Sequence, residues 1–162
     1  MRPMTLAEPI RMYIEYHQAM TRRVWESIQH LSEEQFVAEI PHSHGSVRNQ
    51  MVHLATTDAR WIRCLQGHPE ARQLTFDPAN YPTRQSAQAL WESIAQEVLE
   101  YVTGLDEADF FDVPAGMIGP TWQVLMHIAN HGTDHRAQIL RLLHDSSAPT
   151  FDQDFIMYLW SR

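Results

Sequence analysis

The sequence contains no lysine, because all twelve of its basic residues are arginine. This absence excludes Schiff-base catalysis and the phosphate-binding lysine of a P-loop. The 20 acidic residues give a formal charge of −8, which disfavours binding to nucleic acid. Cys64 is the single cysteine, so an intramolecular disulfide is excluded and a cytoplasmic location is predicted. No apolar run reaches the length of about 18 residues that crosses a membrane, so no membrane partner is predicted.

What the chain does have is enough apolar residues for a core and an excess of histidine. Its 162 residues are 44% hydrophobic, which fits a single globular domain over residues 1–162. Strand patterns are sparse, while apolar residues recur at spacings of three and four, as they do in amphipathic helices. Ten histidines are present, and imidazole is the commonest metal ligand in proteins.

These spacings predict an all-α fold, a four-helix bundle with a short additional helix at the C-terminus. We expect the helices over residues 9–30, 46–67, 83–104, 121–144 and, in the tail, 152–160. Residues 68–82 contain two prolines preceded by Asp77 and Tyr81, and they predict an irregular connection without helix. This connection between the second and third helices is long enough to be a crossover.

Residues that favour helix starts stand at the predicted boundaries. Pro9 suits the first helical position, and Ser46, Thr83 and Thr121 suit the position before a helix. Ser32-Glu-Glu-Gln is a capping-box pattern that predicts a short helical turn. Residues 112–120 hold two prolines and two glycines, which predict a loop or a small hairpin.

Two histidines take inward positions on the last long helix. His131 and His135 stand where the stripe of Val124, Ile128 and Ile139 calls for an aliphatic residue. Four residues apart on a helix, they lie about 6 Å apart along the axis, so their imidazoles can converge on one ion. The pair alone is weak evidence for a metal, since a buried histidine is usually a hydrogen-bonded core residue.

A third histidine strengthens the prediction of a metal site. His53 lies at the edge of the inner face of the second helix. Three imidazoles from two helices would leave open positions on a metal, as catalytic sites do. His127 lies four residues before His131 and could replace His135 as its partner; we interpret it as structural or as supporting a ligand.

The remaining histidines have ordinary interpretations. His42 and His44 stand in a loop with glycine and are interpreted as solvated turn residues. The others have no spacing that pairs them with the predicted site: His17, His30, His68 and His144.

Two segments carry a resemblance to a known family. GSVRNQMVHLATTDARWIRCLQG and TWQVLMHIANHGTDHRAQILRLL resemble the DinB-like superfamily, also called DinB/YfiT metalloenzymes, and the most specific run is His127-x-x-Asn130-His131-x-x-x-His135-Arg136-x-Gln138. The resemblance covers nearly the whole chain. It implies a four-helix bundle, frequent homodimers and one divalent metal, either nickel, zinc, iron or manganese. Carried over by motif, the ligands are His53, His131 and His135.

The residues around the motif restrict the chemistry. His-Gly-Thr-Asp-His lacks the glutamate of the zincin motif, so a peptidase is rejected. Asp58 falls on the inner stripe of the second helix. One interpretation is that it orients a ligand histidine or a bound substrate. The other is an ion pair with a core-facing arginine such as Arg136.

Three functions follow as hypotheses. Some relatives within the superfamily are transferases or isomerases that use a low-molecular-weight thiol such as bacillithiol or mycothiol, so the first is a metal-dependent transferase with such a thiol as co-substrate. A thiol at an open metal position would lose its proton without a protein base. The second is a metal-dependent hydrolase that uses an activated water. The third is a non-enzymatic module that binds a metal or a ligand.

Two surfaces complete the sequence-based picture. A small-molecule substrate is expected in a pocket between the second and fourth helices, roofed by residues 68–82 and 112–120. Phe76, Tyr81, Met117 and Ile118 would favour an apolar acceptor there, unless they only pack the loops. The apolar tail segment FIMYLW could support a homodimer, or could cover the end of the bundle.

Overall fold

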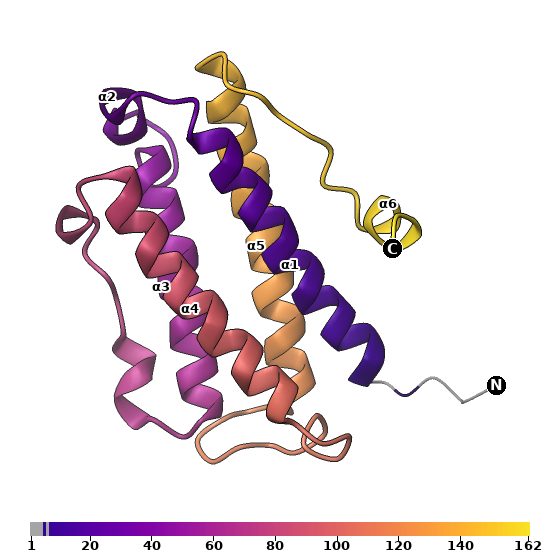
Figure 1. The fold of residues 1–162 in the computed structure, drawn as a ribbon. Helices are drawn as coiled ribbons and strands as arrows, with labels where there is room; N and C mark the ends of the chain where they lie inside the picture. The colour runs from indigo at the N-terminus through magenta and orange to yellow at the C-terminus, as the bar shows by residue number, and fades with distance from the viewer. Residues whose placement is uncertain (1–4, 6) are drawn as a thin grey trace.

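The structure is a computed structural model that describes residue 5 and residues 7–162, and the regular structure within them is entirely helical (Figure 1). The predicted all-α class is therefore confirmed. The long helices are α1 (Ala7–Ile28), α3 (Val47–Leu65), α4 (Arg84–Gly104) and α5 (Thr121–Asp145). The short elements are α2 (Glu33–Val37), α6 (Phe155–Trp160) and the 3₁₀ helices η1 (Pro69–Gln73) and η2 (Pro78–Asn80).

Side-chain caps define several of the helix starts, as predicted. Ser46 accepts a hydrogen bond from the backbone N–H of Asn49 at 3.1 Å and begins α3. Reciprocal capping boxes begin α2 at Ser32 and α4 at Thr83. Each cap satisfies a backbone N–H that has no partner within the helix, which contributes about 1 kcal/mol.

Three predicted local features differ from the structure. Helix α1 begins at Ala7, so Pro9 is its third residue, where the missing N–H still costs no intrahelical bond. Thr121 is the first helical residue of α5, because Pro120 takes the cap position and the Thr121 hydroxyl donates to the Asp112 carbonyl at 3.3 Å. The connection after α3 contains η1 and η2, each of which begins at a proline.

The four long helices pack side by side. Helix α3 contacts both α4 and α5, and α1 contacts both α5 and α4. Helices α3 and α4 run in the same direction (Figure 1), so the connection between them returns along the length of the molecule. This is the predicted crossover, and it places η1 against α3.

The core lies between the inward faces of these helices. Burying each large aliphatic side chain there contributes about 1.5–3 kcal/mol. Among the described residues, none of the helices is both long and apolar enough to cross a membrane. The core includes Ile14, Val24 and Ile28 of α1, Met51, Leu54 and Ile62 of α3, Trp91, Ile94 and Val98 of α4, and Leu125, Ile128 and Ile139 of α5.

Helix α6 packs on α1 through aromatic side chains, while other side chains of α6 face solvent. The ring of Phe155 lies 5.0 Å from the rings of Tyr13 and Tyr16. Met157 and Trp160 are 57% and 75% exposed, so part of the tail faces solvent and does not pack on the bundle. Self-association through this segment stays a prediction, which light scattering at micromolar concentration would test.

Candidate metal centre

Four imidazoles gather where α3 packs against α5. His53 comes from the second turn of α3, and His131 and His135 come from successive turns of α5. The ring centroids of these three lie 5.1 Å (His53 to His131), 4.7 Å (His53 to His135) and 4.4 Å (His131 to His135) apart. The fourth ring, of His44, comes from the loop before α3 and stacks on His53 at 3.8 Å.

The spacing of the ring nitrogens fits one cation. His53 Nε2 and His131 Nε2 lie 3.2 Å apart. Two nitrogens that each bind a tetrahedral ion at about 2.0–2.1 Å lie about 3.3 Å from one another. Ligand atoms of His44, His53 and His135 also lie within 4.8 Å of one another. The cluster is therefore compatible with a divalent metal, and the group of three whose ligand atoms lie this close contains His44 where the predicted ligand set has His131.

His44 is the functional residue that the sequence analysis missed. It was interpreted as a solvated turn residue, and its side chain is exposed, yet its ring covers His53. Two left-handed residues fold the loop back over α3, Ser43 at φ 51° and Gly45 at φ 94°. The Asn49 side-chain amide then donates to the His44 carbonyl at 2.8 Å and fixes the loop. The Ser-His-Gly sequence was the only available signal, since glycine favours positive φ.

Gln50 sets the tautomer of His135. The Gln50 side chain is buried, and its Oε1 accepts from His135 Nδ1 at 2.8 Å, while its amide N–H donates to Gln138 Oε1 at 2.9 Å. With the proton held on Nδ1, the lone pair of His135 stands on Nε2. A hydrogen bond to the far nitrogen is the usual way in which proteins orient a ligand histidine.

The cluster is uncharged at neutral pH. Burial, reinforced by the neighbouring imidazoles, lowers the pKa of both His53 and His131 to about 3. Burial also lowers the pKa of His135 and of His44 from the ordinary value. Because neutral imidazole is the form that binds a metal, the folded chain holds these histidines ready for ligation.

Asp58 lies in a buried network beside the cluster. Arg136 Nη1 lies 2.8 Å from His17 Nδ1, and His17 Nε2 lies 2.9 Å from Asp58 Oδ2. Since a guanidinium only donates, His17 accepts on Nδ1 and donates from Nε2 to Asp58. The hydrogen bond of Asp58 is thus to a histidine outside the predicted ligand set. His17 stands between Asp58 and Arg136, an arrangement that neither interpretation of Asp58 included.

Gly132 makes room for this network. A Cβ atom at Gly132 would lie 2.1 Å from His17 Nδ1 and 2.8 Å from Arg136 Nη1. Close approach of α1 to α5 therefore explains a glycine in the middle of a long helix.

We expect Gly132→Ala to lower the free energy of unfolding. Overpacking costs about 1–3 kcal/mol, and the gain in helix propensity offsets at most about 1 kcal/mol of it. The matched control is Gly104→Ala, where an added Cβ meets no atom within 4 Å, so no loss is expected. Urea denaturation of both variants measures the difference. Equal stability of the two variants would contradict the close contact at Gly132.

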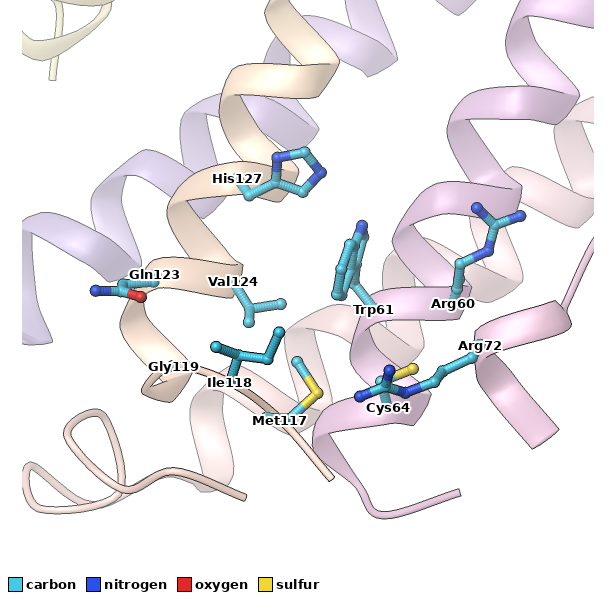
Figure 2. A pocket seen from close by; sticks show the side chains of 10 residues that line it. All are labelled: Arg60, Trp61, Cys64, Arg72, Met117, Ile118, Gly119, Gln123, Val124 and His127. Carbon is cyan, nitrogen blue, oxygen red and sulfur yellow. The ribbon is translucent and has the colours of Figure 1, made fainter. Parts of the chain in front are cut away.

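A pocket lies on the side of His127 away from the cluster, and none of the four clustered imidazoles lines it (Figure 2). It lies between α3 and α5, as expected, and Met117 and Ile118 line it while Phe76 and Tyr81 do not. Those two aromatic residues pack against the core instead. His127 lies between the pocket and the cluster, since its ring lies 5.3 Å from that of Trp61 and 5.7 Å from that of His131.

The fold and the cluster together define an all-helical protein with a histidine site compatible with a divalent metal. The model of the DinB family matches residues 4–161, so the chain belongs to the DinB family. A search of curated proteins finds no significant match.

Proposed function

We propose that this DinB-family chain is a four-helix-bundle metalloenzyme that holds one divalent transition metal on His53, His131 and His135. The observation that carries the proposal is the 3.2 Å separation of His53 Nε2 and His131 Nε2, which is close to the spacing of about 3.3 Å expected for two ligands on one tetrahedral ion. Gln50 accepts from Nδ1 of His135, so the lone pair of this imidazole stands on Nε2, where it could bind the metal. Three imidazoles suit nickel, zinc, copper and iron alike, so the ligands do not select one metal.

The proposed reaction transfers a group between a low-molecular-weight thiol and an electrophile. A divalent cation, when bound, lowers the pKa of a thiol beside it, so that a thiolate nucleophile is available at neutral pH. The protein contributes neutral imidazoles in a partly buried site. Within the described part of the chain, no carboxylate hydrogen-bonds to any of the four imidazoles, and Asp58 is occupied by His17. A thiol needs no such base, and the preference for transfer over hydrolysis rests on the resemblance to thiol-dependent relatives.

Turnover assays test the reaction directly. We expect protein purified without a nickel column to conjugate model electrophiles only when bacillithiol, mycothiol or glutathione is present. His135→Ala should reduce turnover at least a hundredfold, because it removes a ligand. His144→Ala is the matched control, since His144 is an exposed histidine in the last turn of the same helix.

Other results of these turnover assays would favour one of the alternative functions. Turnover that needs His135 but no thiol would favour the metal-dependent hydrolase. Turnover that ignores His135→Ala would place the chemistry outside the cluster. No turnover with any thiol or electrophile, in a protein that binds its metal, would favour the non-enzymatic binding module.

A further inference from the structure

The pocket beside the histidine cluster is a built cavity with mostly apolar walls. Its volume is about 540 Å³, within the range of about 300–1,000 Å³ that small-molecule sites occupy. Trp61 and Cys64 of α3 form one wall, Val124 of α5 another, and Met117 of the preceding loop the floor (Figure 2). Ile118 of the same loop is 99% exposed, so an apolar side chain stands at the rim of the pocket.

Two arginines give this pocket a positive charge that nothing in its lining neutralises. Arg60 and Arg72 both line it, and the described residues of its wall include no carboxylate. This is notable in a chain with 20 acidic and 12 basic residues. Figure 2 shows the Arg72 guanidinium reaching from η1 across Cys64 toward Met117.

Both guanidinium groups are held in place by the backbone. Arg60 donates to the Leu74 carbonyl from Nε at 3.1 Å and from Nη2 at 2.7 Å. Arg72 donates from Nη2 to the Gly116 carbonyl, which ties η1 to the loop before α5. A guanidinium has five N–H donors, so each arginine keeps donors for a ligand. Carbonyl partners fix the groups without cancelling their charge.

His127 lies between the pocket and the cluster. Its imidazole forms the end of the pocket next to Trp61 and stands beside the ring of His131. The charge of Arg60 also reaches His53, where it contributes to lowering the pKa of that imidazole. A molecule in the pocket would therefore have one end at the arginines and another near the cluster.

We propose, building on the function proposed above, that this pocket binds the acceptor substrate and that the acceptor is a carboxylate with an apolar, aromatic or alkyl body. The carboxylate pairs with Arg72, the charge of Arg60 further along the same side adds to the attraction, and the body lies against Trp61 and Met117. Guanidinium groups bind carboxylates through paired N–H donors. A sugar or a nucleotide would need many neutral hydrogen-bonding groups, and Gln123 is the one side-chain amide in the lining.

Binding to metal-free protein tests the pocket apart from the cluster. The probes are 3-phenylpropionate and its neutral analogue 3-phenylpropanamide, titrated into EDTA-treated protein and followed by the NMR signal of the Trp61 indole N–H. We expect the acid to bind at least ten times more tightly than the amide. Arg60→Gln and Arg72→Gln should each reduce this preference to threefold or less. Arg141→Gln, at an exposed arginine of α5 paired with Asp145, should preserve it.

Each alternative result overturns the proposal in a recognisable way. Equal affinity for acid and amide, or a preference that survives both arginine substitutions, would show that these arginines recognise no carboxylate. A preference that appears only after metal is restored would place the carboxylate on the metal. Melting curves of each variant exclude unfolding as the cause. Failure of the chain to bind metal would refute the proposed function while leaving this measurement readable.

Discussion

Replacing His131 with alanine is expected to abolish metal binding. The bound metal should fall from about one ion per chain to less than a tenth, and His53→Ala should do the same. Each substitution removes one of the two nitrogens that lie 3.2 Å apart, and the remaining imidazoles then cannot complete three ligands from α3 and α5. Elemental analysis of protein purified without a nickel column measures the content.

His44→Ala is the decisive comparison, because His44 belongs to the alternative group of ligands, which is His44, His53 and His135. We expect this variant to keep its metal, since the His44 side chain is exposed and belongs to a loop, whereas His131 is anchored in a helix. Loss of metal in His44→Ala together with full content in His131→Ala would assign the ligands to His44, His53 and His135 instead. Melting of the wild-type protein with and without metal gives a second readout. A metal at a hundredfold excess over its Kd raises the free energy of unfolding by about 2.7 kcal/mol.

Helical periodicity was sufficient to find the elements that hold the cluster. His131 and His135 interrupt an aliphatic stripe at helical spacing, and His53 lies on the stripe of α3, so local sequence placed each on an inward face. That these faces meet depends on the packing of α3 against α5, which periodicity does not specify. The family resemblance supplied that pairing.

Contacts between distant segments account for what the sequence did not predict. His44 reaches the cluster through two positive-φ residues, and such backbone turns leave little trace in residue patterns. His17 has no helical spacing to the site because its partners, Asp58 and Arg136, belong to other helices. Arg60 stands in a sequence typical of a solvated helix face, yet its guanidinium is held by the carbonyl of Leu74, and the residue lines the pocket.

Removing Asp58 is expected to cause a large loss of stability. Arg136 is fully buried, and the carboxylate of Asp58 is the negative charge that reaches it through His17. Burial lowers the pKa of the Arg136 guanidinium, and the charge of Asp58 opposes that shift. Breaking a buried pair by removing one partner typically costs about 3–5 kcal/mol, because the other charge stays buried without compensation.

The size of this effect can be measured against an exposed pair of the same type. We expect Asp58→Ala to lower the free energy of unfolding by about 3–5 kcal/mol in EDTA-treated protein, by urea denaturation. Asp145→Ala is the control, since Asp145 pairs with Arg141 on the surface, where loss of the partner has little effect. Asp58→Asn keeps an acceptor for His17 and should cost less than Asp58→Ala. If Asp58→Ala proved no more destabilising than Asp145→Ala, the carboxylate would not be compensating Arg136, and a role toward the cluster or a bound substrate would become the better interpretation of Asp58.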